Sequence, residues 1–241
     1  MYHKLIDLPI EIEIYAPYGT PAYQLSDEFL RDKQDQSIQD VIGNYAVPFN
    51  KYWLFILYAV RKMNHNRYSL NVGRVIRQKI CYILSRSGLP MGFTFKESSY
   101  GPFSKEVDQA IMALSNANYM TEKQSGRMTE TIVSSSFRFP YEDFSEQEMT
   151  AANQAVDLLS RIKNTDHAEM IATVMFSYDE LKAKNNSEPK DVEVFNHVLN
   201  WKKRWKECKE EDIKSMIYNL SALGWMSPVF SGELAFAEDL F

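Results

Sequence analysis

The sequence predicts a mainly helical protein of the α+β class, in which a winged-helix-like unit with a small β-hairpin carries a C-terminal helical bundle. Apolar residues repeat at helical spacing in residues 71–87 and 104–114, which predicts two amphipathic helices. Residues 118–139 are rich in Thr and Ser and turn at Gly126, which predicts a hairpin. The chain of 241 residues is 45% apolar, enough to bury a substantial core.

The chain divides into four parts. We expect a strand and an acidic linker in 1–48, the winged-helix-like unit in 49–139, a helical bundle packed on it in 140–230, and an acidic and aromatic tail in 231–241. In the first part, Ile10–Ile14 alternates isoleucine with glutamate, as strands with one apolar face do. Such a strand needs a partner, so it either joins the wing or closes a domain that this chain lacks.

The helix predicted for 71–87 is the centre of the winged-helix-like unit. Residues 49–63 are apolar on nearly all sides and predict a buried helix before it. Lys79 falls inside the apolar arc of the central helix, so we expect it to meet a buried acceptor and to have a structural role. The opposite face is predicted to meet solvent or a partner, and it carries Arg74, Arg77, Gln78 and Ser85.

The motif Tyr100-Gly101-Pro102-Phe103 marks the start of the next helix, predicted for 102–117. Pro102 is expected to fix the helix start, with Ser104 or Gly101 as its cap. Gly101 is expected to adopt a conformation that a side chain would resist. We favour a structural turn over a contact site for this motif.

The bundle is predicted from capping signals and apolar stripes. Ser145–Glu148 has the pattern of a capping box, and Asp166–Glu169 repeats it before the apolar segment 170–176, which predicts a central helix. Asp191 is expected to cap the following helix. Gly224 follows the last apolar stripe, at the place of a left-handed C-cap.

Charge is distributed unevenly along the chain. Residues 51–96 contain nine basic residues and no acidic one, whereas the whole chain has a net charge of −5. The basic block is either a surface for phosphates or an acidic partner, or it is compensated in three dimensions by the acidic remainder. The sequence supports the two interpretations equally.

The sequence contains no recognisable catalytic motif, so we expect a non-enzymatic protein without a cofactor. No glycine-rich nucleotide loop is present, and His3, His65, His167 and His197 lack metal-ligand spacing. Cys81 and Cys208 are expected to be reduced thiols. The longest apolar run, 52–60, is too short to span a bilayer, and no signal peptide is recognisable, so we expect a cytoplasmic protein with no membrane partner.

Four motifs in order resemble the C-terminal domain of DarG-type macrodomain antitoxins. The resemblance covers residues 50–226. It is carried by Gln78-Lys79-Ile80, Tyr82, Leu84, Gly88, Phe95 and Tyr100–Phe103, by Glu169–Val174, by Val198, Trp201 and Lys202–Arg204, and by Ile213, Leu220 and Leu223–Met226.

The resemblance implies a non-catalytic antitoxin. In the family, this domain binds DarT, a toxin that ADP-ribosylates single-stranded DNA, and occupies its DNA site as a DNA mimic. A separate macrodomain removes ADP-ribose, and we expect this chain to lack that activity because it lacks that domain. The expected partner-binding residues are Arg74, Arg77, Tyr100, Phe103, Trp201 and Arg204. The expected structural residues of the motifs are Gln78, Lys79, Tyr82, Gly101, Pro102, Gly224 and Trp225.

Two other hypotheses remain. The chain could be a winged-helix DNA-binding regulator that uses the helix 102–117 and the basic helix before it. Glu106 and Asp108 on that helix are a poor complement to phosphate. Arg74 and Arg77, or Lys123 and Arg127 of the wing, could nevertheless contact a DNA backbone. The third hypothesis is an enzyme. The sequence shows neither the metal ligands nor the nucleophile that this hypothesis would need.

Overall fold

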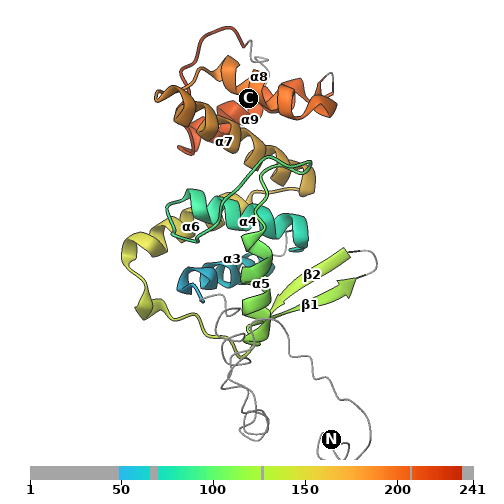
Figure 1. Ribbon diagram of the computed structural model, residues 1–241, viewed down its shortest axis with the longest axis vertical. Coiled ribbons are helices and arrows are strands. Elements are labelled where there is room, and N and C mark those ends of the chain that lie inside the picture. Colours follow the sequence, from blue (N-terminus) through green and yellow to red (C-terminus); the bar gives the residue numbers. More distant parts are fainter. Residues whose placement is uncertain (1–48, 66–69, 126–127, 207, 235–241) are drawn as a thin grey trace, which may run out of the picture.

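The structure, a computed structural model, describes residues 49–65, 70–125, 128–206 and 208–234 (Figure 1). The strand and linker predicted for 1–48, Gly126 and Arg127, and tail residues 235–241 lie outside the described residues. The described elements are η3 (Lys51–Trp53), α3 (Leu54–His65), α4 (Arg74–Arg86), α5 (Glu106–Asn116), β1 (Met120–Ser125), β2 (Met128–Val133), η4 (Tyr141–Asp143), α6 (Glu146–Ser160), α7 (Thr165–Asn185), α8 (Asp191–Trp201), η5 (Lys203–Trp205) and α9 (Glu210–Ala222). This mainly helical architecture with a two-stranded antiparallel sheet confirms the predicted fold class.

The first half has the element order of a winged helix. Helices α3, α4 and α5 are followed by the β1–β2 hairpin, in which Met120 lies opposite Val133. Just before α4, the Val72 carbonyl accepts a hydrogen bond from the Thr131 amide at 2.9 Å. The segment between α3 and α4 therefore lies beside β2, on the side away from β1.

Helix α5 begins at Glu106, four residues later than predicted. Phe103 and Lys96 exchange two backbone hydrogen bonds of 2.9 Å, which keep the chain extended past Pro102. Neither Gly101 nor Ser104 caps the helix; its N-cap is Lys105, which makes no side-chain capping bond. The expectation that Pro102 fixes the helix start was therefore wrong.

The buried helix predicted for 49–63 is confirmed as η3 and α3, although Phe49 itself is exposed. Phe55 has no exposed surface and packs against Phe139 and Phe144. The other face of α3 contacts α4 and β2. The segment that leaves the hairpin thus returns across α3 before α6 begins.

Helix α7 is the centre of the second half, as the apolar segment 170–176 predicts. It contacts α8 and α9 on one side and α4 on the other, and α6 contacts both α3 and α4. Figure 1 shows these helices as stacked layers, with α8 and α9 at one end and α3 with the hairpin at the other. One apolar core runs through both halves of the chain.

The capping predictions had mixed outcomes. Ser145 forms the predicted capping box with Glu148, and Gly224 follows α9 with a left-handed φ of +74°. Helix α7 is instead capped by Asn164, whose Oδ1 accepts from the His167 amide at 2.8 Å. Asp191 is the first residue of α8 rather than its cap, and its buried carboxylate accepts from the Ser231 amide and hydroxyl.

None of the described helices combines the length and the apolar character that crossing a bilayer requires.

Candidate functional site

A pocket of about 800 Å³ opens between α4, α5, β1 and the loop before α5. Its volume lies in the range of small-molecule and peptide-side-chain sites. Apolar side chains of α5 and β1 form part of its wall, and charged groups stand among them. Four predicted partner-binding residues line this pocket together: Arg74, Arg77, Tyr100 and Phe103.

One end of the pocket is formed by two arginines of α4 and Glu122 of β1. Arg77 is 5% exposed; it forms an ion pair with Glu122 and donates to Thr131 Oγ1 at 3.2 Å. Arg74, one turn earlier, has an exposed side chain whose guanidinium is 4.0 Å from the Glu122 carboxylate. Glu122 and Thr131 of the hairpin therefore bind the buried Arg77 and leave Arg74 accessible to solvent.

Arg77 and Gln78, which lie on the face of α4 predicted to meet solvent or a partner, are not exposed to solvent. The Gln78 side chain is buried and forms two hydrogen bonds with the backbone of Ser104, donating to its carbonyl at 3.0 Å and accepting from its amide at 3.1 Å. The hairpin and the loop before α5 cover this face. Both covering segments are distant in sequence, so helical periodicity alone does not report them.

Lys79 lies beneath the Tyr100–Phe103 motif and is 2% exposed. Its ammonium donates to the Pro102 carbonyl at 2.9 Å, which confirms the expected buried acceptor. Burial lowers the pKa of Lys79 to about 7, against the opposing effect of the Glu169 charge. Lys79 thus ties α4 to the motif.

Gly101 has a left-handed φ of +86°, as predicted. A Cβ atom there would lie 3.0 Å from Thr173 Oγ1 and 3.2 Å from Lys79 Nζ. Both the backbone conformation and the close approach of α4 and α7 therefore require glycine at this position.

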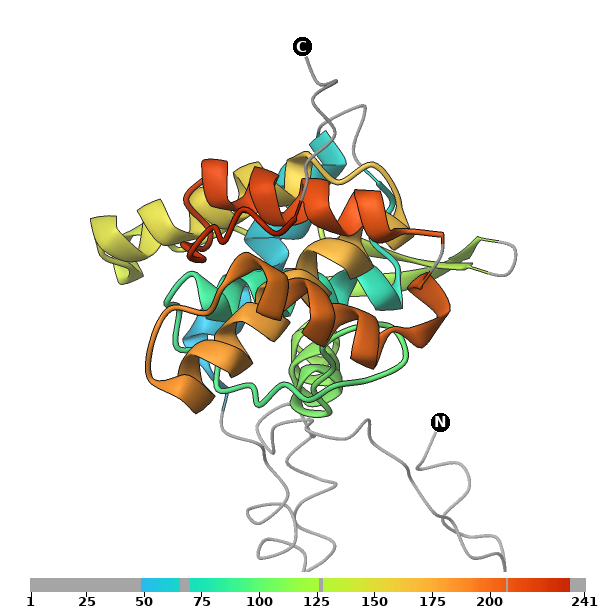
Figure 2. The same ribbon diagram turned by 90° about the horizontal axis from the view of Figure 1, so that it is seen from above.

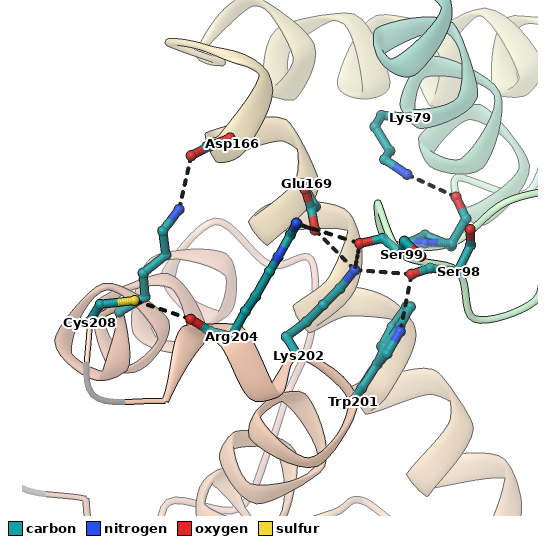
Figure 3. Close-up of polar contacts among 11 residues, drawn as sticks. Lys79, Ser98, Ser99, Asp166, Glu169, Trp201, Lys202, Arg204 and Cys208 are labelled. Atoms are coloured by element: carbon teal, nitrogen blue, oxygen red, sulfur yellow. Dashed lines mark hydrogen bonds and ion pairs between the residues drawn. The ribbon is translucent and has the colours of Figure 1, made fainter.

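The loop before α5 is held by residues near the end of α8 (Figure 3). Lys202 Nζ donates to the carbonyls of Ser98 and Ser99 at 3.0 and 2.6 Å, and Trp201 Nε1 donates to Ser98 at 3.2 Å. Two further contacts hold this loop: Arg204 Nη2 donates to the Ser99 carbonyl, and Lys79 donates to the Pro102 carbonyl.

Glu169 of α7 forms ion pairs with the two cations that hold the loop, Lys202 and Arg204. Its Oε1 lies 2.9 Å from Lys202 Nζ and 2.6 Å from Arg204 Nη2. Burial lowers the pKa of Lys202, while the hydrogen bond to Glu169 acts in the opposite direction. Trp201 and Arg204, predicted to bind a partner, therefore both contribute to positioning the loop.

Tyr100 is the most exposed aromatic residue that lines the pocket, with 58% of its surface accessible. The Arg204 guanidinium carbon lies 5.7 Å from the centroid of its ring, within cation–π range. Phe103 is 37% exposed. The anchored loop therefore presents two aromatic side chains at the pocket.

The remaining motif residues lie at the opposite end of α4. Asp179 of α7 forms an ion pair with Arg86 at 2.6 Å and accepts a hydrogen bond from the Tyr82 hydroxyl at 3.2 Å. Arg86 also donates to the carbonyl of Trp225, which follows Gly224. These residues have a structural position, away from the pocket, and burial raises the pKa of Tyr82.

The basic block is compensated internally in part. Arg77 and Arg86 pair with acidic side chains, and Lys51 and Arg61 donate to backbone carbonyls. Glu122 and Asp179, the two acidic partners, were not identified from the sequence because each lies more than 40 residues from its arginine.

A second group of polar residues lies beside the loop. Glu97, Glu180 and His197 place one ligand atom each within 4.8 Å of one another, so these side chains could hold a metal ion. His197 Nε2 is 3.7 Å from Glu180. Burial and the Glu97 charge raise the pKa of Glu180, and His197 lowers it. Sequence spacing could not reveal this group, because it joins three separate elements.

Neither protein-family models nor curated proteins yield a match to this chain.

Proposed function

We propose that this protein is a non-catalytic antitoxin that binds a DarT-like DNA ADP-ribosyltransferase directly and occupies its DNA site. The proposal rests on the four ordered motifs that resemble DarG-type antitoxins. The structural observation that supports it most is the convergence of Arg74, Arg77, Tyr100 and Phe103 on one pocket.

The anchored loop suits a protein-binding role. Tyrosine is enriched among residues that dominate binding energy at interfaces. The backbone just before Tyr100 is held by Lys202, which pairs with Glu169, so binding requires little ordering of this loop. Asp108 of α5, an exposed acidic residue that lines the pocket, is suited to a basic groove that normally receives DNA.

The test is a competition experiment with a purified DarT-type toxin. We expect the protein to bind the toxin, to displace single-stranded DNA from it, and to stop DNA ADP-ribosylation at equimolar amounts. Direct binding of the protein to the same DNA should be negligible at about 50 and 200 mM salt alike. Absence of toxin binding, or binding that leaves DNA in place, would contradict the proposal.

A winged-helix DNA-binding regulator is the second candidate. The exposed Arg74, together with Lys123 on the wing, favours it, because both could reach phosphates. Glu106 and Asp108 in the first turn of α5 oppose it. The double substitution Arg74→Glu and Lys123→Glu spares the buried Arg77, and it should abolish DNA binding if the protein is a DNA reader. A salt-steep DNA affinity that this variant loses would favour the regulator.

A further inference from the structure

Helices α7 and α8 pack side by side and bring two metal-ligating side chains together (Figures 1 and 2). The rings of Phe176 and Trp201 are in contact, with centroids 5.6 Å apart. One turn later on α7 lies Glu180, and one turn earlier on α8 lies His197. His197 Nε2 is 3.7 Å from Glu180 Oε2, so the helices run antiparallel here and the two side chains face each other.

Glu97 completes the group from the loop before α5. Its carboxylate and the ligand atoms of Glu180 and His197 all lie within 4.8 Å of one another. The next residue, Ser98, is fixed to α8, because Trp201 Nε1 donates to its carbonyl at 3.2 Å. Contacts beside the group therefore hold all three backbone segments that carry these side chains, which is the support that a metal site needs.

The two carboxylates of this group lie close together without a hydrogen-bond donor among the described residues. Burial and the Glu97 charge raise the pKa of Glu180, because both oppose its ionised form. His197 Nδ1 is buried and has no hydrogen-bond partner in the described part of the chain. Lys202, on which Glu97 also acts electrostatically, is already paired with Glu169. A cation bound among the three side chains would neutralise both carboxylates.

The donor set selects the class of cation. Imidazole nitrogen suits zinc and other divalent transition metals, whereas magnesium and calcium prefer oxygen ligands alone. In a tetrahedral zinc site, bonds of about 2.0–2.2 Å place neighbouring ligand atoms about 3.3 Å apart. The 3.7 Å between His197 and Glu180 is close to this value, and the exposed Glu97 and Glu180 side chains can rotate toward an ion. Three protein ligands leave a fourth position for water.

We propose that Glu97, Glu180 and His197 bind one divalent transition metal ion of the zinc type, and that this ion fastens the loop before α5 to α7 and α8. Tyr100 lies three residues after Glu97 on the same loop. The ion would therefore add to the contacts through which Lys202 holds this loop. The inference goes beyond the proposed function and needs no toxin for its test.

The first experiment titrates zinc chloride into the full-length chain after metal has been removed with EDTA and the EDTA by dialysis. Calorimetry measures the affinity, and thermal unfolding measures the Tm. We expect the Tm to rise with zinc concentration, because zinc binds the folded state. Magnesium chloride at the same concentrations should give no such rise, since imidazole is not a magnesium ligand.

Substitutions that remove one ligand each locate the site. Glu180→Gln and His197→Gln should each weaken zinc binding by about 10- to 100-fold or more, since even partners outside the ligand shell contribute this much. The matched controls Glu142→Gln and His167→Gln change the same residue types elsewhere and should keep the native affinity. Cys208→Ser should also keep it, which would exclude the exposed thiol as a ligand.

Glu180→Gln also removes the repulsion from Glu97, so its metal-free Tm should not fall below that of the native chain. This comparison verifies that the variant is folded, and Glu97→Gln repeats it at a second exposed position. Amide hydrogen exchange then tests the link to the loop. The Gly101 amide donates to the Ser98 carbonyl at 3.1 Å. Saturating zinc should slow its exchange by about tenfold in the native chain and leave it unchanged in Glu180→Gln.

Equal zinc affinity of the native chain and the ligand variants would overturn the site. Unchanged Gly101 exchange at saturating zinc would overturn its link to the loop. The toxin assay is independent of both results. A chain that binds zinc at these residues but no DarT-type toxin keeps the metal site and loses the proposed function, and a chain that binds the toxin but no zinc gives the reverse result.

Discussion

Lys202 and Glu169 form an ion pair of 2.9 Å in which each side chain is only 3% exposed. The pair joins the end of α8 to α7 and lies directly beneath the loop that carries Tyr100. Lys202 also donates to two loop carbonyls, so the pair both stabilises the fold and positions the candidate site.

We expect Glu169→Gln to destabilise the protein by about 3–5 kcal/mol, because it removes the carboxylate that pairs with the buried Lys202. Urea unfolding at neutral pH measures this change. Asp157→Asn is the matched control, since Asp157 pairs with Arg161 on the surface of α6 and should contribute less than about 1 kcal/mol. Similar losses of unfolding free energy in the two variants would show that the buried Glu169 pair stabilises the fold no more than the surface pair does.

Lys79 predicts a pH-dependent stability with a defined sign. Its pKa is about 7 in the folded state, below the value of about 10.4 in an unfolded chain. Between these values the unfolded state binds the extra proton, so stability rises with pH, by at most about 1.4 kcal/mol per unit. The cost of the buried charge is fully present below about pH 7.

Lys79→Met should remove this slope, even though it leaves the Pro102 carbonyl without its donor. Unfolding free energies of both proteins at about pH 6.5, 8 and 9.5 give the comparison. The native chain should gain stability relative to the variant as pH rises. Parallel pH profiles would show that Lys79 keeps its proton in the folded state.

Gly101→Ala should destabilise the protein more than Gly224→Ala does. Both glycines have positive φ, which costs alanine about 1–2 kcal/mol. Gly224 has open space around it, whereas a Cβ at Gly101 meets Thr173 and Lys79. We expect about 1–2 kcal/mol of additional loss at Gly101, measured by thermal unfolding. An unchanged Tm combined with lost toxin binding would instead make the motif a contact site.

Tyr100→Ala should weaken toxin binding by about 2 kcal/mol while leaving the Tm nearly unchanged, because the ring is mostly exposed. Calorimetric titration with the toxin measures the affinity. Tyr141→Ala is the control, since Tyr141 is 55% exposed on η4 and does not line the pocket. Equal affinities for the Tyr100 and Tyr141 variants would place the binding surface elsewhere.

The sequence predicted most of the helices because their apolar stripes and caps are local features. Ser145, Gly224 and the buried Lys79 all followed from spacing within one helix or its ends. The predictions failed where a distant segment changed the outcome. Gln78 looked exposed by periodicity, yet the Ser104 backbone satisfies its amide. Glu169 completed an apparent capping box, yet two cations from beyond α8 bind it.

The candidate site was only partly predictable for the same reason. The motif residues Tyr100, Gly101 and Phe103 were identified from the sequence, since they are contiguous. The Ser98 and Ser99 carbonyls carry no side-chain signal, and the pairing of Arg77 with Glu122 depends on how the hairpin folds back onto α4. Long-range pairings of this kind need the three-dimensional structure.

The anchor formed by Lys202 and Arg204 sets the order in which a newly synthesised chain can acquire its site. The loop at Ser98 and Ser99 emerges from the ribosome more than 100 residues before its donors, which lie 103 to 105 positions further along. At about 5–20 residues per second, that interval is about 5–20 s. During this time the loop lacks its principal hydrogen-bond donors, so the Tyr100 surface is complete only after Arg204 has been synthesised. A prematurely terminated chain ending before Trp201 would contain every residue that lines the pocket. It would still lack the three side chains that hold the loop in position.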